Sequence, residues 1–258
     1  MISTMLRASL LLVAGLALGG CLPDDLRDPP AAVLFTAAPS DATRDGFRTD
    51  DGWDVRFDTF ALTLGRVGFQ NSDECSRYSF TYYDWLIDFT KAKREKVGLI
   101  HGLGFCSFRL ASESIDGETR LGAGATSALR DEMGWANVRV EGVATREGEV
   151  KRFDFSLIRP TQLGPCLYDG FGVDYRFLLP DEEVEVELEV RGEGLFAHFP
   201  GDEPLFERFA VADSDFDGVL TDDEVDGLFS PVGYNEWTFS PLGVVVAPRD
   251  GFGCADDG

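Results

Sequence analysis

Short segments in which apolar and polar residues alternate constrain the fold of this chain more than any other feature. The longest begins at Trp53, and its apolar positions change parity near Asp58 and again near Gly65. Successive side chains of a β-strand point to opposite faces, so alternation predicts a strand and a change of parity predicts a bend or bulge. We therefore expect one long, bent strand that ends at Phe69.

Eight further segments have the composition of short strands, and most are bounded by Gly, Asp, Ser or Pro. The chain has no internal repeat, no glycine-rich phosphate-binding motif and no βαβ spacing. These features predict a mainly β fold, an antiparallel β-sandwich with hairpin connections. The predicted strands are residues 78–83, 85–89, 105–110, 137–144, 151–158, 173–178, 183–190 and 242–247.

The segment EEVEVELEV at residues 182–190 alternates glutamates with aliphatic residues. A second cation-binding face would have this pattern. Any half-buried strand would have it too, because its carboxylates face water while its aliphatic side chains face the core. We adopt the second interpretation for Glu183, Glu185, Glu187 and Glu189.

The composition is that of an acidic globular protein. Hydrophobic residues make up 44% of the 258 residues and aromatic residues 12%, which is enough for a packed core and excludes a disordered chain. The formal net charge of −23 repels nucleic acid and anionic lipid, so we expect neither as a ligand. The same charge attracts cations and keeps an exported protein soluble.

The first 21 residues, MISTMLRASLLLVAGLALGGC, have the organisation of a secretory signal, with one basic residue, an apolar run and small residues before Cys21. Residues 18–21, Leu-Gly-Gly-Cys, resemble the lipobox of bacterial lipoproteins, in which the cysteine is acylated and becomes the first mature residue. The resemblance implies a lipid (palmitate) anchor. Leu22 stands where an Asp would resemble an inner-membrane retention signal, which implies the outer membrane, on its periplasmic or its surface side. The alternatives are cleavage without acylation and a retained anchor.

Four cysteines follow Cys21, and no two of them form a C-x-x-C pair. Their wide spacing argues against a zinc site or thioredoxin-like redox chemistry. In an oxidising compartment an even number of cysteines predicts two structural disulfides. Three pairings are open to Cys75, Cys106, Cys166 and Cys254.

The segment DSDFDGVLTDDE at residues 213–224 has the spacing of a calcium loop. Carboxylates fall on positions 1, 3 and 5, a glycine permits the sharp turn at position 6, and a glutamate closes the loop at position 12. The segment resembles the EF-hand loop at every diagnostic position, including the aliphatic residue at position 8. The predicted calcium ligands are Asp213, Asp215, Asp217, the carbonyl of Val219, Thr221 and Glu224.

Apolar residues at helical spacing flank this loop, at 205–209 and 225–229, and predict a short helix on each side. Thr221 and Glu224 also have the spacing of a capping box, so a helix cap and an ion compete for the glutamate. We expect the ion to take it. A similar segment at residues 41–52 lacks the closing glutamate and is rejected as a site.

No catalytic motif is recognisable in the chain. His101 and His198 are the only histidines, neither lies in a motif, and no G-x-S-x-G or H-E-x-x-H occurs. We therefore expect no enzymatic activity. The abundance of acidic residues leaves a hydrolase with paired carboxylates as an open alternative.

A fainter resemblance concerns DEMGWANVRVEG at residues 131–142, which is followed by the strand VKRFDFSL and then by Cys166. It is similar to exported copper-associated proteins in which a Met-x-Trp segment leads into a strand ending in Glu-Gly, and which act beside di-haem peroxidase-like partners. The resemblance covers the region from Trp53 to Cys166 and implies a β-sandwich body and metal handling with a redox partner. Met133 and Trp135 match loosely and no His-rich ligand set accompanies them, so the other interpretation makes Trp135 an ordinary core residue.

The predicted function is that of a calcium-binding outer-membrane lipoprotein with a binding or structural role, in which calcium stabilises the C-terminal region. A single calcium loop is expected to stabilise the structure around it rather than to sense a signal. The sequence does not identify a protein or glycan partner. The predicted organisation is a signal peptide at 1–20, a tether at 21–45, a β-sandwich domain at 46–200, an EF-hand-like segment at 201–232 and a C-terminal strand and tail at 233–258 that complete the β domain.

Overall fold

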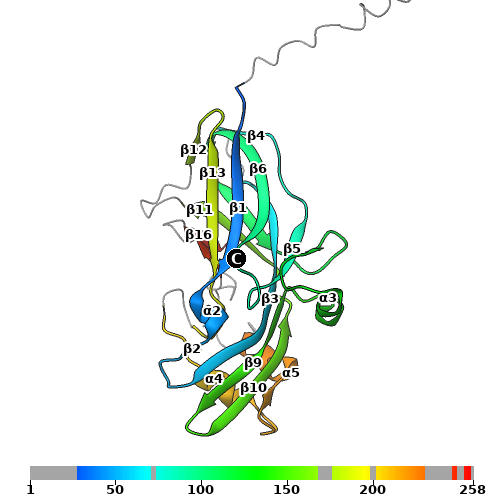
Figure 1. Ribbon diagram of the computed structural model, residues 1–258, viewed down its shortest axis with the longest axis vertical. Helices are drawn as coiled ribbons and strands as arrows, with labels where there is room; N and C mark the ends of the chain where they lie inside the picture. The colour runs from blue at the N-terminus through cyan, green and yellow to red at the C-terminus, as the bar shows by residue number, and fades with distance from the viewer. Residues whose placement is uncertain are drawn as a thin grey trace, which may run out of the picture.

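The computed structural model describes residues 28–70, 74–167, 176–197, 202–229, 246–248 and 253–256. Over these residues the protein is mainly β and is elongated (Figure 1). The first sheet has the order β12-β6-β1-β13-β15, with β4 also paired to β6. Its strands are β1 (Ala31–Pro39), β4 (Cys75–Arg77), β6 (Glu95–Cys106), β12 (Arg176–Leu178), β13 (Glu183–Val190) and β15 (Val246–Pro248).

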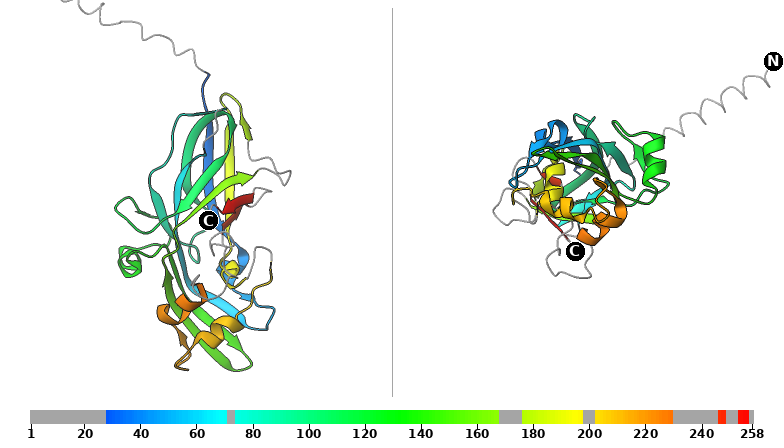
Figure 2. Two further views of the ribbon diagram at one scale, coloured as in Figure 1. Left: turned by 180° about the vertical axis from the view of Figure 1, so that it is seen from behind. Right: turned by 90° about the horizontal axis from the view of Figure 1, so that it is seen from below.

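The second sheet has the order β14-β10-β9-β3-β7-β11-β16, with β2 and β5 also paired to β3 and β8 paired to β5. Buried residues of both sheets form one hydrophobic core. Figure 2 shows the arrangement of the strands from behind and from below. The strands of this sheet are β2 (Phe47–Arg48), β3 (Asp54–Phe69), β5 (Asp84–Asp88), β7 (Phe108–Ser112), β8 (Arg120–Leu121), β9 (Val138–Arg146), β10 (Glu149–Leu157), β11 (Thr161–Leu167), β14 (Val219–Leu220) and β16 (Gly253–Asp256).

The mainly β class is confirmed, but the sheets are mixed rather than purely antiparallel. β1 and β13 run parallel over their whole length, from the Ala32–Glu183 pair to the Pro39–Val190 pair. β5 pairs with β8 and β10 pairs with β14 in the same sense. Parallel neighbours require a long connection that returns the chain to the same end of the sheet. Hairpin signals in the sequence do not reveal such connections.

The predicted tether at residues 21–45 is wrong over β1, because this segment is a central strand of the first sheet. Val33, Phe35 and Ala37 have no exposed surface. The sequence did not reveal this strand because its alanines and flanking prolines weaken the alternation of strongly apolar and polar residues. Small side chains nevertheless pack well in a crowded core. It is followed by the short helix α2 (Asp41–Asp45), which Ser40 caps by accepting a hydrogen bond from the Thr43 amide at 3.0 Å.

The long, bent strand predicted from Trp53 to Phe69 is confirmed as β3, including both irregularities. Its register shifts between Phe57 and Thr59 against β9, and between Gly65 and Gly68 against β7. A side chain at Gly65 would bring a Cβ to 2.5 Å from the Asp84 Cα, so only glycine permits this close approach of β3 to β5.

The other predicted strands had mixed outcomes. Segments 85–89, 137–144, 151–158 and 183–190 correspond to β5, β9, β10 and β13, and the aliphatic residues of the acidic strand β13 are buried as expected. Segment 78–83 is not a strand, and 105–110 spans the junction between β6 and β7. Most of β6 was missed because its three glycines interrupt the alternation. The segments 173–178 and 242–247 lie partly outside the described residues.

One disulfide is present among the described side chains, and it joins Cys75 of β4 to Cys106 of β6. This pairing leaves a single possibility for the remaining two cysteines. Their backbones are register partners, because Cys166 of β11 stands opposite Cys254 of β16. Their side chains lie outside the described part of the molecule.

We predict that Cys166 and Cys254 form the second disulfide. Peptide mapping of the mature protein under non-reducing conditions should recover the two peptides as one cross-linked species. Because the bond closes a long loop, the Cys166→Ala/Cys254→Ala variant should lose roughly 3–5 kcal/mol of unfolding free energy in the chain-entropy model. Free thiols at both positions in protein taken from its native compartment would contradict the prediction.

Candidate metal centre

A helix-loop-helix segment lies at one end of the molecule, against β9 and β10 (Figure 1). The helices are α4 (Glu207–Ala212) and α5 (Asp222–Phe229), both as short as the sequence predicted. Phe209 of α4 and Val225 of α5 are buried in the main core. Phe209 stacks on Phe155 of β10 with ring centroids 6.4 Å apart, which holds the segment onto the sheet.

The loop between the helices is shaped by its own carboxylates and by one glycine. Asp215 accepts a hydrogen bond from the Asp217 amide at 3.1 Å, and Asp217 accepts one from the Val219 amide at 2.7 Å. Gly218 has φ +82°, a conformation that glycine adopts without the steric cost of a Cβ. The loop thus turns where the calcium-loop spacing requires it to turn.

The end of the loop is fastened to the second sheet rather than to another loop. Val219 and Leu220 form β14, which pairs in parallel with Arg152 and Phe153 of β10. The Arg152 amide donates a hydrogen bond to the Gly218 carbonyl at 2.8 Å. A single loop therefore obtains from the sheet the backbone pairing that an isolated two-residue strand lacks.

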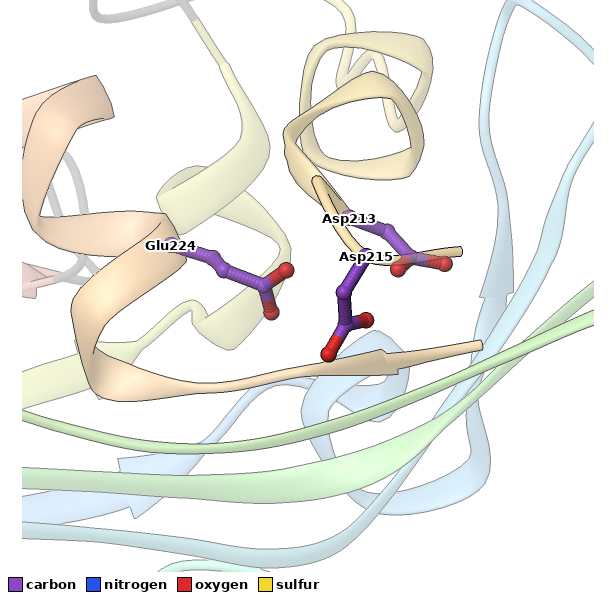
Figure 3. Close-up of side chains that lie close together, drawn as sticks. All are labelled: Asp213, Asp215 and Glu224. Carbon is purple, nitrogen blue, oxygen red and sulfur yellow. The ribbon is translucent and has the colours of Figure 1, made fainter. Parts of the chain in front are cut away.

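Three of the six predicted ligands come together in this loop. Carboxylate oxygens of Asp213, Asp215 and Glu224 lie within 4.8 Å of one another, with Glu224 reaching across from α5 (Figure 3). Asp217 is outside this group, and Thr221 donates its hydroxyl hydrogen to Glu224 at 3.1 Å. The backbone carbonyl predicted at Val219 belongs to the segment that pairs with β10.

Asp213 is the buried member of the group, with 2% of its surface exposed. Its Oδ2 accepts hydrogen bonds from the Lys151 ammonium at 2.5 Å and from the Gly218 amide at 3.0 Å. Its Oδ1 is buried and accepts no hydrogen bond from the described residues. An unpaired buried carboxylate oxygen is costly, and a bound cation would satisfy it.

The two ends of the loop are both held in the charged form. The Lys151 ammonium lowers the pKa of Asp213 by donating a hydrogen bond to it. Burial alone would raise the pKa of Glu224, but hydrogen bonds from the Ser214 and Thr221 amides outweigh it and lower that pKa. These amides lie 2.7 and 3.1 Å from the Glu224 carboxylate. Glu224 thus fills the helix-capping role that competes with an ion, and it is ionised at neutral pH.

Lys151 is a member of this site that the sequence gave no reason to select. Its side chain reaches from β10 and is only 12% exposed. In the sequence it is one of several lysines, more than sixty positions away from its partner Asp213. Only the pairing of β14 with β10 places it beside the loop.

The chemistry of the donor set fits a hard divalent cation. All three grouped side chains offer carboxylate oxygens, which Ca²⁺ and Mg²⁺ prefer to the nitrogen and sulfur ligands favoured by copper or zinc. Ca²⁺ accepts the irregular, flexible geometry of such a loop, whereas Mg²⁺ requires a smaller, nearly octahedral shell. Lys151 supplies one positive charge that an arriving cation must displace or tolerate.

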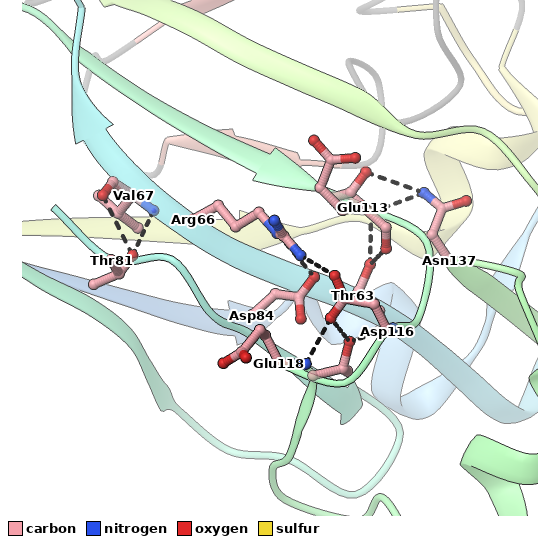
Figure 4. A network of polar contacts seen from close by, with 11 residues as sticks. Thr63, Arg66, Val67, Thr81, Asp84, Glu113, Asp116, Glu118 and Asn137 are labelled. Atoms are coloured by element: carbon pink, nitrogen blue, oxygen red, sulfur yellow. Dashed lines mark hydrogen bonds and ion pairs between the residues drawn. The ribbon is translucent and has the colours of Figure 1, made fainter.

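A second polar cluster, absent from the sequence-based predictions, lies at the bulge of β3 (Figure 4). Asp84 of β5 is completely buried, and neither of its carboxylate oxygens accepts a hydrogen bond from the residues described. Arg66 approaches it to 3.8 Å and forms an ion pair with Asp116. Arg66 itself has φ +45°, a strained value for a residue with a side chain.

Burial raises the pKa of Asp84, although the nearby Arg66 guanidinium offsets part of this effect. A raised folded-state pKa means that the folded protein holds a proton that the unfolded chain has lost. The associated stability is therefore present below the unfolded pKa of about 4 and is lost as the pH rises through the folded pKa.

We predict that Asp84→Asn raises the unfolding free energy at neutral pH by about 1–2 kcal/mol, because it removes a poorly satisfied buried charge without changing the side-chain size. Urea unfolding at several pH values should show this gain shrinking toward pH 4. A variant less stable than the parent at pH 7 would instead mean that the ion pair with Arg66 outweighs the cost of burial.

The residues of the other sequence-based hypotheses lie apart from the two acidic clusters or outside the described residues. His101 Nδ1 and the Ser79 hydroxyl lie 3.2 Å apart and share a hydrogen bond. His198 lies outside the described residues. Trp135 is 73% exposed, so the interpretation of Trp135 as a core residue is wrong, whereas Met133, at the end of α3 (Ser127–Met133), is buried. Cys21 also lies outside the described part.

Comparisons with protein-family models, with curated proteins and with solved structures found no match to this chain. Over the described residues, none of the helices has the length and hydropathy needed to cross a membrane. The fold and the site therefore define this molecule only by class, as a mainly β protein with a carboxylate-rich helix-loop-helix segment.

Proposed function

We propose that this protein is a calcium-binding lipoprotein of the outer membrane, with a structural or binding role and no catalytic activity. In this proposal the EF-hand-like segment binds one Ca²⁺, and the ion fastens the C-terminal region to the β-sandwich body. The ligands are Asp213, Asp215, Asp217, the Val219 carbonyl, Thr221 and Glu224.

The observation that carries the calcium proposal is the state of Asp213. One oxygen of this buried carboxylate has no hydrogen-bond partner among the described residues. Carboxylate oxygens of Asp213, Asp215 and Glu224 lie within 4.8 Å of one another in a loop with calcium-binding spacing. A solvated acidic surface would leave each carboxylate hydrated, so it would not require this burial. The oxygen-only donor set also favours calcium over the copper-associated alternative.

The size of the effect supports a structural role rather than a switch. Extracellular calcium modules bind at ~10⁻⁴–10⁻³ M. At ~1 mM Ca²⁺ and a Kd of ~0.1 mM, binding stabilises the folded state by about 1.4 kcal/mol. For a domain of this size this corresponds to a rise in Tm of roughly 3–5 °C.

Calcium titration of the purified mature protein tests the proposal. Calorimetry should detect one site that saturates in the sub-millimolar to millimolar range, and Tm should rise with saturation. Mg²⁺ should produce a much smaller rise, because it gives up its hydration shell reluctantly. No calcium-dependent change in Tm would mean that Lys151 serves as a permanent counter-ion and that the loop is not a calcium site.

The lipid anchor has a separate test. Globomycin should cause the unprocessed precursor to accumulate, and Cys21→Ala should abolish acyl labelling of the protein. Release of the wild-type protein as a soluble, unacylated species would contradict the lipoprotein assignment and would leave the calcium proposal untouched.

A further inference from the structure

The chain enters the fold at the end of the molecule opposite the candidate calcium site (Figure 1). Ala31, the first residue of β1, pairs with Gly102 of β6. The Asp181 amide, in the turn before β13, donates a hydrogen bond to the Pro29 carbonyl at 3.2 Å. β4, the end of β6, β12 and this turn therefore surround the point at which the chain enters, and we call them the entry end.

Three large apolar side chains are exposed at the entry end. Phe105 of β6 and Phe177 of β12 are 45% and 51% exposed, and Leu179, which follows β12, is 54% exposed. Phe105 and Phe177 are register partners whose rings lie 4.8 Å apart, so they project from the same face. Leu179 follows Phe177 by two positions and extends the same apolar patch.

The length of the preceding chain restricts what can cover this patch. Asp28, the first described residue, is seven positions after Cys21. Even fully extended, these seven steps of the chain span at most about 25 Å. A lipid on Cys21 would therefore hold the entry end close to the membrane surface, whereas the candidate calcium site points away from it.

The charges at the entry end indicate which kind of lipid surface it can contact. Arg176 is paired with Glu182 at 2.8 Å, and Asp181 is exposed beside them. No excess of basic side chains is present among the described residues of this turn to attract anionic headgroups. Exposed aromatic and aliphatic side chains partition instead into the boundary between headgroups and acyl chains, which an uncharged membrane surface offers.

We propose that Phe105, Phe177 and Leu179 form a membrane-contact patch that inserts into the lipid surface to which Cys21 is anchored. This inference rests on the proposed lipoprotein assignment. The patch adds buried apolar area to the lipid anchor and fixes the orientation of the protein on the membrane. It leaves the calcium-binding end directed away from the bilayer.

Depth measurement on the acylated protein in phosphatidylcholine vesicles tests the proposal. A nitroxide is attached to Leu179→Cys, and a matched control carries it at Val211→Cys, an exposed position (71%) on α4 at the opposite end. The label at position 179 should be accessible to oxygen and shielded from a water-soluble nickel complex, so its accessibility ratio should exceed that of the control severalfold. In the Phe105→Ser/Phe177→Ser background this difference should largely disappear.

The outcomes separate the two proposals. The membrane-contact patch alone would be overturned if mass spectrometry shows the protein to be acylated and it floats with the vesicles, but the nitroxide at position 179 is exposed to water. A label that stays in the lipid after Phe105 and Phe177 are replaced would also overturn it. Protein that is neither acylated nor floats with the vesicles would overturn the lipoprotein assignment and the patch together.

Discussion

Replacement of Glu224 by Gln should weaken calcium binding roughly 10- to 100-fold, which corresponds to a loss of ~1.4–2.8 kcal/mol. The substitution removes one charge and the two-oxygen grip of the residue at position 12 while keeping the side-chain size. It also removes a carboxylate that accepts hydrogen bonds from the Ser214 and Thr221 amides. The calcium-induced rise in Tm should therefore fall to about a third of its parent value, or less, at ~1 mM calcium.

The control for this substitution lies on the acidic strand β13. Glu187 forms an ion pair with Arg94 at 3.2 Å, whereas Glu183 is exposed, so Glu183→Gln is the cleaner control. It changes the net charge by the same amount and should leave calcium affinity unchanged. Equal weakening by Glu224→Gln and Glu183→Gln would mean that calcium associates diffusely with an anionic surface, and the loop assignment would be wrong.

Replacement of Lys151 by Met should have the opposite effect and tighten calcium binding about tenfold. The Lys151 ammonium lies 2.5 Å from Asp213, so it competes with the cation for the same carboxylate. Two unit charges 4 Å apart repel by about 1 kcal/mol even in bulk water, and the double charge of Ca²⁺ doubles this value. Met keeps the length and the apolar packing of the lysine stem without the charge.

The same variant should be less stable than the parent in the absence of calcium, because Asp213 then loses its only described cationic partner. Calorimetry and thermal melts with chelator and with calcium would measure the two effects. Lys93→Met, at an exposed position, is the control for net charge and should change neither quantity appreciably. Weaker calcium binding by Lys151→Met would show that the lysine positions the loop for the ion rather than competing with it.

The sequence predicted strands correctly where one face of the strand is buried and the other is solvated. β13 and the first half of β3 follow the period of two because water and core impose it on successive side chains. The bends of β3 were predictable for the same reason, since a bulge transfers the pattern to the other parity. β1 and β6 escaped prediction because alanine and glycine carry little hydrophobic contrast even where they are fully buried.

The spacing of carboxylates between residues 213 and 224 is a local property, so the sequence by itself determined which loop is the candidate metal centre. Ligand spacing, the turn at Gly218 and the apolar faces of the two helices all depend on neighbours within a few positions. The predicted export and the proposed anchor at Cys21 likewise rest on one contiguous segment of the sequence.

Only the tertiary structure decided what surrounds that loop. The parallel pairing of β14 with β10 brings Lys151 to Asp213, and the mixed sheet places β1 between β6 and β13. Each of these contacts joins segments that are distant in the chain. No local preference specifies them, because they form only when burial of one shared core outweighs the entropy of closing long loops.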